Sequence, residues 1–221
     1  MGTVDASVVD SWRGITSWLE IHAPVTFAAL APPASDEDLR AMRDDVGKNL
    51  PDDLITWWRL CNGTGLADGN GMLLPPFFEP CSLHDVLAKR SIRVGSGAPT
   101  AIHNATAATA GSPAGAFLAS FVPIAADGGG DLLFVDLRPG PRHGCVQHWS
   151  GEDGTDGGPW WTGVADMLAD VAGALHTGSE ARRRYVETRE QHVQASTNQA
   201  AVDDGRLVWT STPRDHPLLG R

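Results

Sequence analysis

The chain has 221 residues, 42% of them hydrophobic, and a formal net charge of −10 at pH 7. This length allows one sizeable core with a smaller appendage, and the composition is that of a globular protein rather than a disordered one. No apolar run approaches the roughly 20 residues that a membrane-spanning helix needs. The N-terminus, MGTVDASVVD, lacks the basic and apolar segments of a secretory signal, so we expect a cytoplasmic protein.

The negative charge lies in the first four-fifths of the chain. Residues 1–178 contain 21 acidic and 10 basic side chains, whereas residues 179–221 contain 6 acidic and 7 basic ones. An acidic body should be repelled by nucleic acid and by anionic membranes, and it could attract a basic protein. The alternative is that the charge only keeps the protein soluble. We therefore expect a domain over 1–178 and an accessory tail over 179–221.

Two helices are expected before residue 48. Apolar residues at helical spacing predict the first helix over 7–22, and Pro24 should end it. Ser35 followed by Asp38 is typical of the start of a helix. Gly47 is placed to end this second helix.

A third helix should begin near Pro51, because proline suits the first helical position. Asp52 and Asp53 suit the positive end of its dipole. Trp57 and Trp58 are adjacent, so on a helix they point about 100° apart. An exposed Trp58 beside the two aspartates would make an interface anchor. The alternative is that both tryptophans are buried under a sheet.

The middle of the chain predicts short elements around a long loop. Residues 72–74 predict an edge strand, and residues 82–93 predict a short helix. Residues 95–116 are rich in Ala, Gly, Ser and Thr, so we expect a mobile loop there. A final core helix is expected over 159–176, after a Gly/Asp loop at 152–158. In the tail we expect a polar helix over 180–199 and a short strand at 207–209.

The segment FVPIAADGGGDLLFVD, residues 121–136, is the most informative part of the chain. Its two apolar runs flank glycines and aspartates, which predicts two strands around a tight turn, and residues 144–149 predict a third strand. The triple glycine is not a P-loop, because a Lys, a Ser or Thr and a helix should follow it, whereas an Asp and a strand do. The residues that characterise this segment are Pro123, Asp127, Gly128, Gly129, Gly130, Asp131 and Asp136.

Three features therefore stand in a fixed order. They are a Trp-containing helix with LAPPAS at 30–35, Gly47 with LPDDL at 50–54 and Asn-Gly at 62–63, and the segment 121–137 with GCV at 144–146 and Trp149. This succession resembles the SUKH superfamily, the domain of the fungal Smi/Knr cell-wall assembly regulators and of many bacterial immunity proteins. The resemblance covers about residues 8–177 and leaves the tail outside.

The resemblance implies an α+β domain in which N-terminal helices pack near a mostly antiparallel sheet. It also implies a protein-binding module rather than an enzyme. Bacterial members are often encoded beside polymorphic toxins, and each neutralises a toxin domain, frequently a nuclease, by binding it. Fungal members act in wall synthesis through partner proteins. The Ala- and Arg-rich composition suits a high-GC bacterium and favours the immunity branch.

Acidic side chains supply the candidate protein-binding surface, because complementary charge speeds association with a basic partner and disfavours wrong ones. The candidates are Asp36, Glu37, Asp44, Asp45, Asp52 and Asp53, with Trp58 and Trp160 as aromatic anchors. The alternative is an ordinary solvated helix face.

An enzyme is the rival interpretation. The best set for a metal or acid–base site is Asp127, Asp131, Asp136, His143 and His148, with Asp131 and His148 at the centre of a metal-dependent hydrolase. No HxH, HExxH or CxxC element organises these residues, so we expect no catalytic residue, no metal and no cofactor. The three cysteines, Cys61, Cys81 and Cys145, should be reduced and mostly buried. The sequence predicts an immunity protein for a basic toxin, with a cell-wall regulator or scaffold as the alternative.

Overall fold

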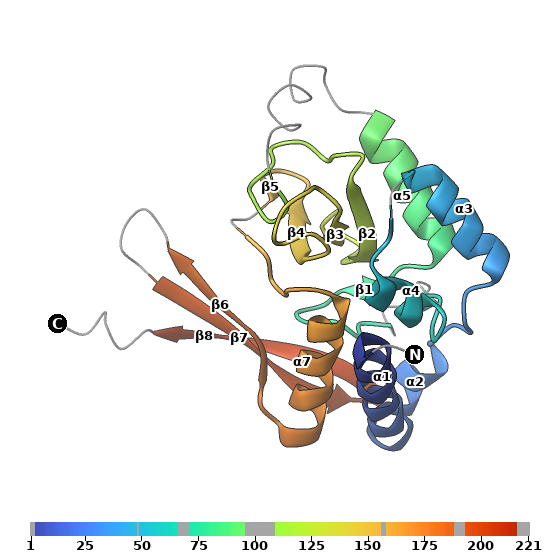
Figure 1. Cartoon of the computed structure of the whole chain (residues 1–221). Coiled ribbons are helices and arrows are strands. Elements are labelled where there is room, and N and C mark those ends of the chain that lie inside the picture. The colour runs from blue at the N-terminus through green and yellow to red at the C-terminus, as the bar shows by residue number, and fades with distance from the viewer. Residues whose placement is uncertain are drawn as a thin grey trace.

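The computed structural model describes residues 3–47, 49–65, 71–95, 109–155, 158–187 and 193–215. These residues form helices and two antiparallel sheets, one of five strands and one of three (Figure 1). The expected α+β class is confirmed. Residues 96–108, most of the expected mobile loop, lie outside the described residues. Among the described helices, none is long and apolar enough to cross a membrane.

The helices include the five that the sequence predicts before residue 178. They are α1 (Thr3–His22), α2 (Pro24–Ala28), α3 (Asp36–Val46), α4 (Asp52–Trp58), α5 (Leu83–Gly95) and α7 (Val164–Thr177). Ser35 and Asp38 form a capping box at the start of α3, in which the Ser35 hydroxyl accepts from the Asp38 amide at 3.1 Å. Gly47 ends α3 with a φ of 60°, a conformation that glycine adopts without steric cost.

The five-stranded sheet has the order β1-β2-β3-β4-β5. Its strands are β1 (Glu79–Pro80), β2 (Phe121–Ala126), β3 (Leu132–Asp136), β4 (Val146–Ser150) and β5 (Gly154–Thr155). The three predicted strands around the glycine turn are confirmed. The strand expected at 72–74 is wrong, because Leu73 and Leu74 are buried in a tight loop that a single bridge from Leu74 to Phe78 closes. Within the expected loop at 152–158, residues 154–155 instead extend the sheet edge.

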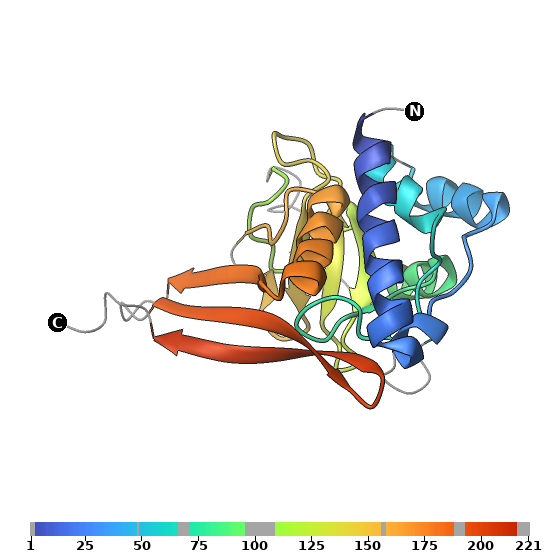
Figure 2. The same cartoon turned by 90° about the horizontal axis from the view of Figure 1, so that it is seen from below.

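The two faces of this sheet are buried by different parts of the chain. Cross-strand pairing places Val122, Val135 and Val146 on one face, where all three are buried. The helices α1, α4 and α7, which contact one another, lie beside the sheet (Figure 2). The opposite face carries Phe134, whose ring packs 6.1 Å from that of Phe117. Phe117, which directly follows the loop expected over 95–116, therefore covers part of this side of the core.

The last core helix, α7, begins about five residues later than expected. Residues 159–163 are used instead for a bridge from Trp161 to Val146 and for the cap at Gly163. The helix ends at Gly178 with a φ of 66°, as expected.

The helix expected over 180–199 is wrong. The tail forms a three-stranded antiparallel sheet, β6 (Glu180–Glu187), β7 (Val193–Asp203) and β8 (Arg206–Asp215), and the strand expected at 207–209 is part of β8. A two-residue turn joins β7 to β8, with positive φ at both Asp204 (45°) and Gly205 (73°). This geometry matches the twist of paired strands, so the turn favours a hairpin over the helix that composition alone suggested.

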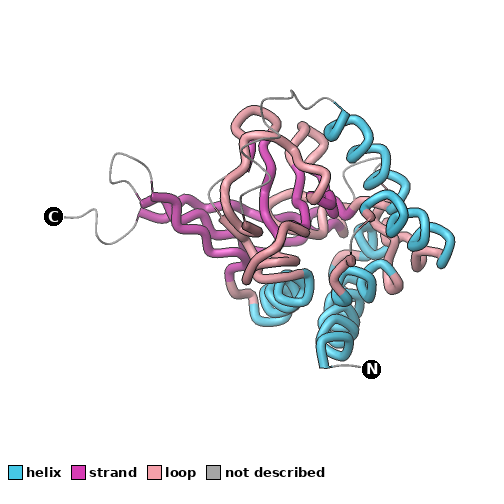
Figure 3. The backbone as a smooth tube through the Cα atoms, turned by 45° about the horizontal axis from the view of Figure 1, so that its top comes forward, coloured by secondary structure: helices cyan, strands magenta, loops and turns pink. Residues whose placement is uncertain are grey.

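One end of the second sheet shares the core of the domain. Leu207, Trp209 and Ala181 are buried in the same hydrophobic cluster as the helices. The Leu207 amide donates to the Thr26 hydroxyl at 2.9 Å, which ties β8 to α2. The other end of the sheet extends away from the body (Figures 2 and 3).

Replacing Gly63 by alanine should destabilise the fold by about 2–4 kcal/mol. Gly63 has a φ of 85°, and a Cβ there would lie 2.5 Å from the Ser82 nitrogen and 2.6 Å from the Cys81 carbonyl carbon. Gly65→Ala is the matched control, because nothing lies within 4 Å of its added Cβ. Urea unfolding of both variants measures the difference, and equal stabilities would contradict this account.

Candidate protein-binding surface

Acidic side chains lie at both ends of α3. Asp36 and Glu37 are exposed at its start, and Asp44 is exposed near its end. Asp44 follows Asp36 by eight residues, which places the two groups roughly 12 Å apart along the helix axis. Asp45 is less available, because its carboxylate accepts from the Arg90 guanidinium at 2.7 Å and so ties α3 to α5.

The two aspartates at the start of α4 have different roles. Asp52 is exposed, whereas Asp53 is buried. The Asp53 carboxylate accepts from the Leu54 amide at 2.8 Å and from the Ala165 amide at 3.0 Å. Since Ala165 belongs to α7, Asp53 joins two helices from inside the fold and offers a partner no exposed charge.

The aromatic anchors lie deeper than an interface would need. Trp57 and Trp58 are 2% and 1% exposed, so the alternative that both belong to the core is the one observed. Trp160 is partly exposed, and its ring stacks on that of His148 with centroids 4.8 Å apart. It also meets the Phe78 ring edge-on at 6.0 Å. Of the expected anchors, only Trp160 reaches the surface.

A groove lies where the end of α3, the start of α4 and the β3–β4 loop meet. Its volume is about 690 Å³, and it is lined by Arg43, Gly47, Asn49, Leu50, Pro51, Asp52, Ile55 and His143. Only Asp52 among these was expected on the binding surface. His143 follows Asp52 by some 90 residues, so no local pattern could have indicated that the two share a groove.

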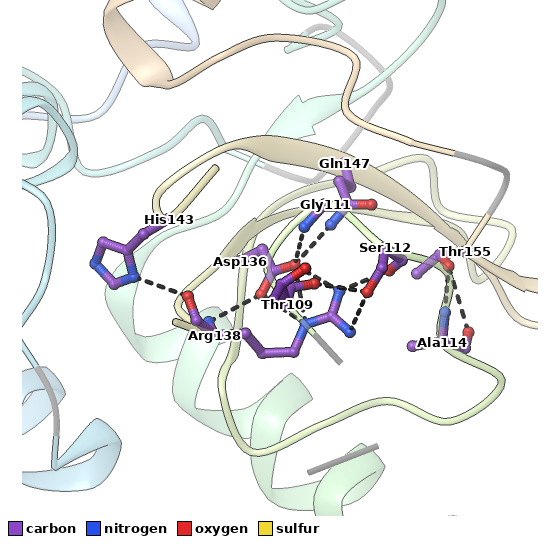
Figure 4. Close-up of polar contacts among 9 residues, drawn as sticks. All are labelled: Thr109, Gly111, Ser112, Ala114, Asp136, Arg138, His143, Gln147 and Thr155. Atoms are coloured by element: carbon purple, nitrogen blue, oxygen red, sulfur yellow. Dashed lines mark hydrogen bonds and ion pairs between the residues drawn. The ribbon is translucent and has the colours of Figure 1, made fainter. Parts of the chain in front are cut away.

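A buried ion pair holds the β3–β4 loop from within (Figure 4). The Asp136 carboxylate is fully buried and accepts from the Arg138 guanidinium at 2.7 Å. It also accepts from the Gln147 side chain at 2.8 Å and from the Gly111 amide at 2.9 Å. Arg138 donates in turn to the Ser112 carbonyl at 2.7 Å. The network thus fixes the loop against two neighbouring segments.

His143 takes its orientation from the same network. Its Nδ1 lies 3.1 Å from the Arg138 carbonyl oxygen. The loop closes on itself through the Gly144 amide, which donates to the Asp136 carbonyl at 2.8 Å. The end of β3 therefore positions the loop residues that place the His143 side chain at the groove.

The glycine turn uses its aspartates to stabilise the backbone. One oxygen of Asp127 accepts from the amides of Gly129, Gly130 and Asp131 at 2.8–2.9 Å. Asp131 contacts His148 Nε2 at 3.1 Å and accepts from the Gly151 amide at 3.2 Å. Of the residues in the rival metal site, the structure thus joins Asp131 to His148. In the part of the chain that the structure describes, no three His, Cys, Asp or Glu side chains are placed to hold a metal ion.

The three cysteines are free and buried. Burial raises the pKa of Cys61 to about 11 and the pKa values of Cys81 and Cys145 to about 12. Because the thiolate is the reactive form, these thiols are poor nucleophiles at neutral pH.

A protein-family model matches the part of the chain that contains the elements of this surface. The model of the SMI1 / KNR4 family (SUKH-1) matches residues 33–170, more than half of the chain. The chain belongs to the SMI1 / KNR4 family (SUKH-1). The resemblance seen in the sequence is thereby confirmed. The matched range contains α3, α4, the glycine turn and the β3–β4 loop of this SUKH-1 domain, whereas α1 and the three-stranded sheet lie outside it. A comparison with curated proteins found no match.

Asp136→Asn should lower the free energy of unfolding by about 3–5 kcal/mol, because it leaves the Arg138 charge buried without its counter-ion. Asp153→Asn is the matched control, since Asp153 is exposed in the turn between β4 and β5. Chemical denaturation measures both values. A loss for Asp136→Asn no larger than that of the control would contradict the role given to the ion pair.

The native chain should react slowly with a thiol-specific reagent at pH 7.5. The raised pKa values keep the thiols protonated, so the reaction should accelerate as the pH rises towards 10 and beyond. Unfolding in denaturant is the control and should release three fast equivalents. A fast equivalent in the folded chain at pH 7.5 would show that one thiolate is stabilised and accessible.

Proposed function

We propose that this SUKH-1 chain is a non-enzymatic immunity protein that neutralises a basic toxin domain by binding it directly. The observation that carries the proposal is an exposed acidic surface beside a groove. Asp36, Glu37 and Asp44 on α3 and Asp52 on α4 supply the charge, and the groove adjoins Asp52. Family membership supports a role in recognition of another protein.

Electrostatic complementarity is the reason to expect a basic partner. Single exposed charge pairs contribute only about 0–1 kcal/mol each, so these side chains should act chiefly on the rate of association. The whole chain carries a net charge of −10, which extends the attraction to a basic partner beyond direct contact at low ionic strength. The groove supplies a concave shape that a convex group of the partner can fill.

Some of the side chains that a hydrolase would need stabilise the fold instead. The Asp136 carboxylate is saturated by internal donors, and one oxygen of Asp127 accepts from three amides of the glycine turn. Asp131 and His148 contact each other, but among the described residues no third His, Cys, Asp or Glu joins them to hold a metal ion. The thiols are protonated at neutral pH. These contacts support a fold-stabilising role for the aspartates and favour binding over catalysis.

Co-expression with the toxin domain encoded beside this chain's gene tests the proposal. We expect the chain to protect the host cells and to co-purify with the toxin as a stable complex. Failure to protect and to co-purify would overturn it. Neighbouring genes without any toxin domain would also count against immunity, and would favour a scaffold in cell-wall assembly.

Reversing two charges beside the groove should slow association with that toxin. We expect the double variant Asp44→Lys, Asp52→Lys to lower the association rate by about 10-fold or more at low salt, because attraction becomes repulsion. The matched control is Glu152→Lys, Asp153→Lys, which changes the net charge equally at two exposed positions elsewhere. Stopped-flow kinetics over a range of salt concentrations measures both variants. Equal effects would mean that only the total charge matters.

A further inference from the structure

One wall of the groove is formed by the end of α3. Gly47 lines the groove and ends the helix, with its amide bonded to the Arg43 carbonyl. Asp52, at the start of α4, also lines the groove and is an exposed carboxylate. The groove therefore has a charged hydrogen-bond acceptor where α4 begins.

His143 adds a second acceptor. A carbonyl oxygen can only accept, so the His143 Nδ1 that faces the Arg138 carbonyl at 3.1 Å must carry the proton. In the neutral ring, Nε2 is then an unprotonated acceptor. Figure 4 shows the Nδ1 edge turned towards Arg138 and the rest of the ring directed away from the ion-pair network. The Arg138–Asp136 contacts fix this orientation from within the fold.

The groove also has apolar surface. Leu50 is 7% exposed, and Pro51 and Ile55 are partly buried around it. Long cationic side chains cover apolar surface with their methylene stems while the charged group stays at a polar site.

We propose that this groove binds one arginine side chain of the protein partner. The stem lies along Leu50, Pro51 and Ile55, and the guanidinium donates to the Asp52 carboxylate and to His143 Nε2. Arginine fits better than lysine, because its planar group offers five donors that reach several separated acceptors at once. This inference rests on the proposed binding function and names the chemistry that the groove recognises.

Arg43 is the opposing charge. Among the described residues that line the groove, it is the one permanently charged cation. Its guanidinium should repel the incoming arginine, so the affinity of the native groove for arginine should be lower than it would be without this charge. Removing the Arg43 charge should therefore strengthen binding, whereas removing the Asp52 charge should weaken it.

Titration of the ¹⁵N-labelled full chain with Nα-acetyl-arginine amide, followed by NMR, tests the pocket. We expect shifts confined to the segments that line the groove, residues 43–55 and 140–144, at millimolar concentrations. Nα-acetyl-citrulline amide, the neutral isostere, should give much smaller shifts. Equal shifts from citrulline, shifts spread over Asp36 and Glu37 instead, or tighter binding of Nα-acetyl-glutamate amide would overturn the proposal.

Variants then assign the acceptors. Asp52→Asn should weaken arginine binding by about tenfold, because hydrogen bonds to charged groups are the stronger ones. Arg43→Gln should strengthen arginine binding, because it removes a like charge from the groove. Asp153→Asn is the control, because Asp153 is exposed and lies outside the groove and the acidic surface, and it should leave the affinity unchanged. The amide spectra of the variants report whether the fold is intact. If Arg43→Gln weakens binding, the groove recognises an anion and the assignment is wrong.

The outcome is separable from that of the proposed function. A chain that protects cells from the toxin but does not bind the arginine amide would retain the immunity proposal and lose the arginine pocket. A chain that binds the arginine amide in the groove but gives no protection would retain the pocket and lose the toxin as its partner.

Discussion

The buried ion pair between Asp136 and Arg138 is the constraint on which the rest of this structure depends. Both side chains are almost fully excluded from water, at 0% and 3% exposure, so neither tolerates the loss of the other. Their donors and acceptors come from the strand end of β3, from β4 and from the segment near residue 111. One interaction thereby joins the sheet to an irregular segment that would otherwise have few backbone partners.

The same ion pair links the family's structural features to the proposed binding surface. It fixes the loop that presents His143, and that loop closes a groove against α3 and α4. Asp53 acts similarly from the other side, because it ties the start of α4 to α7. Buried carboxylates thus set the geometry of the site, whereas exposed ones such as Asp52 and Asp44 are available to a partner. Burial, rather than position in the chain, decides which acidic residues stabilise the fold and which are available to a partner.

Sequence patterns predicted the helices and the central strands well, because their causes are local. A capping box, a left-handed glycine and a Gly/Asp turn each involve residues within a few positions of one another. The tail was predicted wrongly as a helix, because its strands are stabilised by pairing between β6, β7 and β8 that composition does not reveal. Asp53 was expected at the surface for the same reason, since its burial depends on a contact with the distant α7. For Trp58 the sequence left surface and core open, and the structure places it in the core.

The sequence by itself determined the fold class, the glycine turn and the family, because these follow from local periodicity and from the order of short motifs. It also determined the charge of the chain and showed that no apolar run is as long as a membrane-spanning helix needs. Only the tertiary structure decided which acidic groups reach solvent and which serve the core. It alone brought Arg43, Asp52 and His143 together, because a groove between elements some 90 residues apart arises from packing and leaves no pattern along the chain.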